Sequence, residues 1–205
     1  MIIIIGPPGS GKGTQIRNIN KITKRPYFSA GDNLKIYGNS HPHIKERIKK
    51  GINIDTDDVN EYLTKTGLAF GLDVIFDGFP RTEKQLHYFL NYNFNDIYVK
   101  NIIEGVFVLH VSDELIFNRI ISRYICNKCH MTYGNQVICC ENFQTSKRID
   151  DINLEVIQKR IDNYHQNINI LLKIYKDSNI PIYYINGEQS IDIVTNDILK
   201  HLEEK

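Results

Sequence analysis

Residues 6–14 read GPPGSGKGT, a run whose residue types and spacing could bind phosphate. Gly6, Gly9 and Gly11 can adopt a positive φ, which lets backbone N–H groups approach phosphate oxygens closely. Lys12 supplies a compact cation for β- and γ-phosphates, and a helix starting here would add N–H donors. The run follows an apolar segment and precedes a helical one, so it predicts a phosphate-binding loop that binds a nucleotide. A glycine-rich turn that contains a lysine by coincidence is the alternative.

A second polar motif, FDGFPRT, occupies residues 76–82 directly after an apolar segment. An Asp at the carboxyl end of a strand beside a phosphate loop suits Mg²⁺, which keeps most of its water shell, so Asp77 would bind it through water. Phe79-Pro80 stiffens the turn, and Arg81 projects a planar guanidinium suited to phosphate oxygens. By itself such a turn is common and indicates no function. Together with the phosphate loop it favours a site for Mg²⁺ and a nucleotide.

All four cysteines fall between positions 126 and 140, which indicates metal ligands rather than a disulfide framework. Cys126 and Cys129 form a CxxC pair, whereas Cys139 and Cys140 are adjacent. Four cysteines suit tetrahedral Zn²⁺, which would have a structural role because a closed site leaves no open position for substrate. Free thiols or a disulfide are alternatives, and the other candidates for a fourth ligand are His130 and Glu141.

Apolar runs alternate with helical stretches along the chain, which predicts an α/β fold with a parallel sheet. The expected strands are 2–5, 27–28, 74–76, 105–111 and 181–185. The expected helices are 12–24, 32–37, 42–50, 56–70, 82–92, 113–123, 153–177 and 190–203. Residues 32–59 lack a strand and residues 124–151 hold every cysteine, so we interpret both as insertions in one core.

Composition excludes several classes of protein. Lys and Arg number 25 and Asp and Glu 24, so the formal net charge of +1 offers no basic excess for nucleic acid. No apolar run reaches the ~18 residues of a membrane span. The opening MIIII is too short for a signal-peptide core, so we expect a cytoplasmic protein that binds neither nucleic acid nor membrane.

Four motifs in order resemble the nucleoside monophosphate kinases, and the adenylate kinase family most closely. They are GPPGSGKGT, FSAGDNLK at 28–35, FDGFPRT with Gln85, and SDELIFNRIISR at 112–123. The resemblance implies a three-layer P-loop fold with a central five-stranded parallel sheet. It also implies a single CORE domain over 1–205 with two insertions, an AMP-binding domain over 29–59 and a small LID over 122–159 that resembles the zinc-bearing LID of many bacterial members.

The resemblance also assigns roles by position. For the catalytic cations it implies Lys12, Arg81, Arg123, Arg148 and Arg160. For the donor ATP it implies Gly9, Ser10, Gly11, Lys12, Gly13, Thr14, Arg119, Arg123, Thr132, Tyr133 and Gln189. For the acceptor it implies Ala30, Lys35, Ile52, Asn53, Ile54, Gly78, Phe79, Pro80, Arg81, Gln85, Arg148 and Arg160, and for Mg²⁺ through water Asp77 and Thr14. Each arginine could instead be a solvated surface charge.

Three positions bear on the acceptor. Ala30 stands where adenylate kinases usually have Thr and resembles the UMP/CMP kinases, and Lys35 stands where the family has Arg. Gln85 resembles the residue that reads adenine through a paired amide, and the cysteine-bearing LID also favours AMP. Between RIDD at 148–151 and Arg160 the chain is one residue longer than the family pattern.

The expected activity is the reversible transfer of the terminal phosphoryl group from MgATP to AMP, giving two ADP, by a monomer whose LID closes to exclude water. A nucleoside monophosphate is already anionic, so the chemistry needs cations and positioning rather than a strong base. A UMP/CMP kinase is the nearest alternative. A nucleotide-dependent switch is a weaker one, because a switch does not need a second phosphate-binding set.

Overall fold

The computed structural model describes residues 1–66, 73–94, 97–126, 128–129 and 131–203. Its centre is a five-stranded sheet in the order β2-β3-β1-β6-β9, in which every pairing is parallel. The strands are β1 (Ile2–Ile5), β2 (Tyr27–Ser29), β3 (Ile75–Asp77), β6 (Gly105–His110) and β9 (Ile182–Asn186). The predicted α/β fold and its five parallel strands are therefore confirmed.

Eight α-helices lie within the described residues, and each begins and ends within two residues of a predicted helix wherever both ends are described. They are α1 (Lys12–Thr23), α2 (Ala30–Tyr37), α3 (Pro42–Lys49), α4 (Thr56–Thr66), α5 (Glu83–Asn91), α6 (Asp113–Ser122), α7 (Leu154–Asp177) and α8 (Ile191–Glu203). Positions 67–70 of the expected helix 56–70 lie outside the described residues. None of the helices described is long and apolar enough to cross a membrane.

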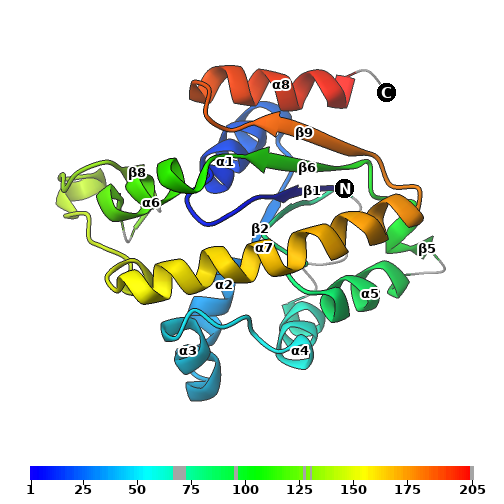
Figure 1. The fold of residues 1–205 in the computed structure, drawn as a ribbon, viewed down its shortest axis with the longest axis horizontal. Coiled ribbons are helices and arrows are strands. Elements are labelled where there is room, and N and C mark those ends of the chain that lie inside the picture. The colour runs from blue at the N-terminus through cyan, green and yellow to red at the C-terminus, as the bar shows by residue number, and fades with distance from the viewer. Residues whose placement is uncertain (67–72, 95–96, 127, 130, 204–205) are drawn as a thin grey trace.

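The sheet is the middle of three layers (Figure 1). Helices cover both faces of the sheet, as the contacts of strand β1 show. Successive side chains of a strand point to opposite faces of the sheet. Ile3 and Ile5 belong to the apolar cluster shared with α5 and α7, and Ile2 and Ile4 to the cluster shared with α1 and α8. A strand buried on both faces must be apolar throughout, as the run of four isoleucines is.

Two segments stand apart from the layers. Helices α2, α3 and α4 lie together below the sheet in Figure 1, and β8 lies at its left edge beyond α6. Strands β7 (Tyr124–Ile125) and β8 (Thr132–Tyr133) form a small antiparallel sheet. Two short helical turns follow it, η3 (Cys140–Asn142) and η4 (Ile149–Asp151). The helical segment follows the carboxyl end of β2. The small sheet follows α6, which itself begins just after the carboxyl end of β6. Ligands of α/β folds bind at such strand ends.

Candidate active site

The loop between β1 and α1 has the conformation that phosphate binding requires. Gly9 and Gly11 have φ values of +82° and +96°, and Gly11 precedes the first turn of α1. Gly6 does not have the positive φ that we expected from its type. Glycine is needed at position 6 because there is no room for a side chain. A Cβ there would lie 2.6 Å from Ser10 Oγ and 3.1 Å from the Leu109 carbonyl oxygen.

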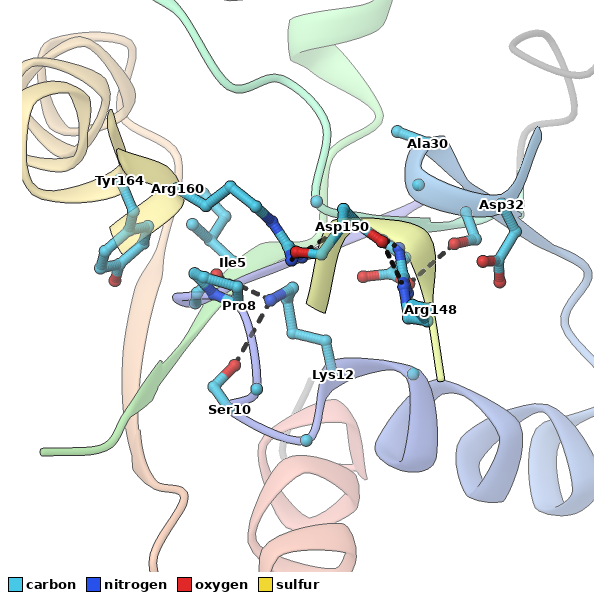
Figure 2. A pocket seen from close by; sticks show the side chains of 18 of the residues that line it. Ile5, Pro8, Ser10, Lys12, Ala30, Asp32, Arg148, Asp150, Arg160 and Tyr164 are labelled. Carbon is cyan, nitrogen blue, oxygen red and sulfur yellow. Dashed lines mark hydrogen bonds and ion pairs between the residues drawn. The ribbon is translucent and has the colours of Figure 1, made fainter. Parts of the chain in front are cut away.

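Lys12 turns back over its own loop, as Figure 2 shows. Its ammonium donates to the carbonyl oxygens of Gly6 and Pro7, both at 2.7 Å. Burial and nearby arginines lower the pKa of Lys12 to about 7, against the opposing effect of Asp77. A cation held by carbonyl oxygens at the loop can be released to a phosphate that enters there.

The turn after β3 positions Asp77 and Arg81. Ser29 lies beside Asp77 in the β2–β3 register and donates its hydroxyl to Asp77 Oδ2 at 3.0 Å. Gly78, at φ +60°, brings its carbonyl oxygen within 2.6 Å of Arg81 Nε. The carboxylate and the guanidinium therefore leave the same turn toward the phosphate loop, where Mg²⁺ and phosphate would be bound.

Phe79 behaves differently from its neighbours in this motif. Its ring is buried against Phe28, Phe76 and Phe89 in the core. A large apolar ring gains more from the core than from a polar phosphate site. Among the residues predicted for the nucleotide sites, Phe79 is therefore the one that does not line the cavity described below.

Gln85 lies in the first turn of α5 and is 2% exposed. Its side-chain oxygen accepts the Arg81 backbone N–H at 2.8 Å, and its nitrogen donates to the Ile54 carbonyl at 3.0 Å. These two hydrogen bonds fix the orientation of the amide between the backbone of Arg81 and that of Ile54. One lone pair and one N–H of the amide remain for a ligand.

Two adjacent carboxylates organise the remaining cations. Asp150 accepts from Lys35 at 3.0 Å. It also accepts from Arg148 at 3.1 Å and pairs with Arg160 at 3.3 Å, as can be followed in Figure 2. Burial alone would raise the pKa of Asp150, but these three cations outweigh it and hold the pKa far below its usual range. The neighbouring Asp151 is a second acceptor for Arg160, at 2.8 Å.

Arg148 and Arg160 thus meet at one carboxylate. Ile152, just after η4, is 68% exposed, and Asn153 caps α7 by accepting from two backbone N–H groups. The connection between η4 and α7 therefore lies at the surface rather than at the site.

The opposite end of the site has few charges. Arg119 of α6 donates through both terminal nitrogens to the Gly187 carbonyl, at 3.1 and 3.2 Å. Gln189 donates to Asp197 at 3.0 Å. Arg119, Gly187 and Gln189 line this end, where the flat face of the Arg119 guanidinium could stack on a base.

One cavity of about 520 Å³ joins these parts. Every predicted nucleotide-site residue except Phe79 lines it, from Arg119 and Tyr133 at one end to Ile54 and Gln85 at the other. The prediction missed further lining residues, and the polar ones among them include Gln15, Arg17, Asp32, Asp150, Asn163 and Tyr164. The two adjacent aspartates of RIDD at 148–151 could have indicated Asp150, because buried arginines need acidic partners.

The four cysteine sulfurs lie within 4.8 Å of one another. Cys126 and Cys140 are 3.6 Å apart, and Cys129 and Cys139 are 3.5 Å apart. Sulfurs at ~2.3 Å from a tetrahedral Zn²⁺ would be separated by about 3.8 Å, so the arrangement fits that ion and adjacent cysteines do not prevent it. The alternative ligand His130 and the side chain of Glu141 lie outside the described residues.

A phosphate loop on a parallel sheet, with clustered cations between two halves of one cavity, defines a nucleotide-binding protein suited to phosphoryl transfer. The family model described as adenylate kinase matches residues 4–180. The chain belongs to the adenylate kinase family. It is 33% identical to the adenylate kinase of Rickettsia conorii, over 98% of this chain and 99% of the relative. It is 36% identical to that of Pelagibacter ubique, over 96% of each.

Proposed function

We propose that this protein catalyses the reversible transfer of the terminal phosphoryl group of MgATP to AMP, giving two ADP. The observation that carries the proposal is the convergence of Lys12, Arg81, Arg123, Arg148 and Arg160 on the middle of one two-ended cavity. Phosphoryl transfer needs the charge on the equatorial oxygens stabilised while the attacking and leaving oxygens stay in line. Five cations between two nucleotide sites meet that need.

The donor ATP occupies the phosphate-loop end in this proposal. The loop and Lys12 bind the β- and γ-phosphates, Arg119 lies against adenine, and Thr132 and Tyr133 contact the nucleotide from β8. Adenylate kinases use Mg²⁺ with ATP, and the ion would neutralise phosphate charge here. Asp77 and Thr14 would hold its water shell, since Mg²⁺ retains most of its waters.

The acceptor AMP occupies the other end. Lys35, Arg81 and Arg148 hold its phosphate, whose oxygen attacks the γ-phosphorus while the bond to the β-phosphate oxygen breaks. Because that attacking oxygen is already anionic, no general base is needed. The segment 52–54 lines the acceptor base, together with Gly78 and Pro80.

Gln85 supports AMP over a pyrimidine nucleotide. Its fixed amide keeps one acceptor and one donor position open, and adenine offers the matching donor at N6 and acceptor at N1. Ala30, with no hydroxyl to contribute, leaves the pocket less specific and is the residue that would favour UMP or CMP.

We further propose that residues 29–59 and 122–159 act as an AMP-binding domain and a LID that close over the cavity and exclude water. The four cysteines would hold a structural Zn²⁺ that stiffens a LID too small for a core of its own. The enzyme would act as a cytoplasmic monomer.

The test is steady-state phosphoryl transfer from MgATP to AMP, UMP, CMP and GMP in parallel, with ATP alone as the control. We expect AMP to be far the best acceptor. Comparable rates with UMP or CMP would contradict the role given to Gln85 and favour a UMP/CMP kinase. ATP consumption that is independent of any monophosphate would contradict a kinase and favour a nucleotide-dependent switch. Lys12→Met should keep the fold and lower kcat by orders of magnitude.

A further inference from the structure

Tyr133 stands between the four-cysteine cluster and the nucleotide cavity. It lines the cavity from β8, and its hydroxyl oxygen lies 3.0 Å from Cys139 Sγ. A phenol hydroxyl donates readily, and a metal-bound cysteine is a thiolate that accepts such a hydrogen bond well. One side chain thus touches both sites.

The backbone at Tyr133 and just before it is already fixed. Tyr133 pairs with Tyr124 in the β7–β8 ladder, and the Cys126 N–H donates to the Met131 carbonyl at 3.0 Å. What remains free is the orientation of the Tyr133 ring and hydroxyl. The hydrogen bond to Cys139 is the contact that restricts it on the cysteine side.

We propose that Tyr133 couples metal occupancy of the four-cysteine cluster to the affinity of the donor nucleotide. The proposal rests on the proposed function only in placing ATP at the β8 end of the cavity. When a metal holds Cys139 as a thiolate, the charge-assisted hydrogen bond fixes the Tyr133 ring in its cavity-lining position. A fixed ring lowers the ordering cost of nucleotide binding, so ATP binds more tightly.

Linkage makes the effect reciprocal: ATP must tighten metal binding by the same factor by which the metal tightens ATP binding. A metal that only stabilises the LID fold need not act through one hydroxyl. Removing the Tyr133 hydroxyl oxygen therefore separates the two effects. It should abolish the coupling between metal and ATP while leaving the stabilisation of the LID fold by the metal.

The experiment measures ATP binding by titration calorimetry with Mg²⁺ and without AMP, so that there is no acceptor and no turnover. The full-length protein is compared in its Zn²⁺-loaded and chelator-stripped forms. We expect Zn²⁺ to tighten ATP binding by about fivefold or more, the lower end of typical coupling. In Tyr133→Phe the Kd for ATP should be the same in the Zn²⁺-loaded and chelator-stripped forms. In a competition with chelator, ATP should no longer raise the affinity of this variant for Zn²⁺.

The matched control is Tyr124→Phe, which removes a hydroxyl from the paired residue on β7 and should keep the coupling. Thermal melting checks that each variant is folded. Equal ATP affinity of the wild type with and without Zn²⁺, full coupling in Tyr133→Phe, or no Zn²⁺ binding at all would each overturn the proposal. Coupled ATP binding without transfer to AMP would instead contradict the proposed function and leave the coupling supported.

Discussion

Arg123 and Asp151 form a two-point ion pair, with Arg123 Nε and Nη2 donating to the two carboxylate oxygens at 2.8 and 2.7 Å. The Asp151 side chain has no exposed surface, and it also accepts from Arg160 at 2.8 Å. One buried carboxylate therefore holds two arginines at fixed positions beside Lys12. Positively charged groups fixed in this way need little rearrangement when negative charge develops during transfer.

Asp151→Asn keeps the shape of this residue but removes its charge. Because a broken buried pair typically costs 3–5 kcal/mol, we expect the unfolding free energy of the ligand-free protein to fall by about 3 kcal/mol. We expect kcat to fall about 10²-fold, as when one preorganised donor is lost. Steady-state kinetics and denaturant unfolding measure the two effects. Asp162→Asn is the control, because the Asp162 carboxylate accepts from Gln158 at an exposed part of α7. An unchanged kcat in Asp151→Asn would contradict this role.

Gly9→Ala and Gly11→Ala separate backbone strain from crowding in the phosphate loop. Both glycines have positive φ, so alanine is strained at either position by about 1–3 kcal/mol. A Cβ at Gly9 would also lie 2.8 Å from Ile120 Cγ1, whereas a Cβ at Gly11 meets nothing within 4 Å. We expect the melting temperature without nucleotide to fall further in Gly9→Ala. A larger fall in Gly11→Ala would contradict the packing of α6 on the loop.

The sequence allowed the fold to be predicted because its signals are local. Four consecutive isoleucines and a glycine-rich loop before a helix each specify their own structure within a few residues. The Asp150 contacts could not be predicted in this way, because Lys35 lies 115 positions from its partner. The ring of Phe79 lies in the core, which adjacency in a motif could not predict, because it says nothing about which side of the backbone a ring takes.

Lys12 gives the reaction a pH dependence. Its pKa in the free enzyme is about 7, so the ammonium dominates below pH 7 and the neutral amine above it. In the proposed function the ammonium binds the donor phosphates, so kcat/KM for ATP should fall by up to tenfold per pH unit above about pH 7. A profile that stays flat from pH 6 to 9 would contradict this.

The same lowered pKa affects stability with a defined sign. Above pH 7 the folded Lys12 is mostly neutral, while the unfolded one remains protonated up to the ordinary lysine pKa of 10.5. The unfolded state then binds more protons, so stability of the ligand-free protein should rise with pH in that window. Denaturant unfolding of Lys12→Met, measured beside the wild type, should show a smaller rise because that variant has no group to titrate.

Lys35→Arg tests the acceptor side separately. Burial and the charge of Arg148 lower the pKa of Lys35 to about 8, against the effect of Asp150. In the wild type kcat/KM for AMP should therefore fall above about pH 8, as the ammonium that holds the acceptor phosphate is lost. Arg stays charged and adds a planar fork for phosphate, so the variant should retain kcat/KM for AMP to higher pH.

The comparison with ATP distinguishes a local effect from a general one. In Lys35→Arg the fall of kcat/KM for ATP near pH 7 should stay where it is, because that fall belongs to Lys12. Lys65→Arg, at an exposed position of α4 paired with Glu61, is the control and should leave both profiles unchanged. If Lys35→Arg shifts the two profiles together, or shifts neither, Lys35 does not hold the acceptor phosphate. A shift confined to AMP places the charge of Lys35 on the acceptor side alone.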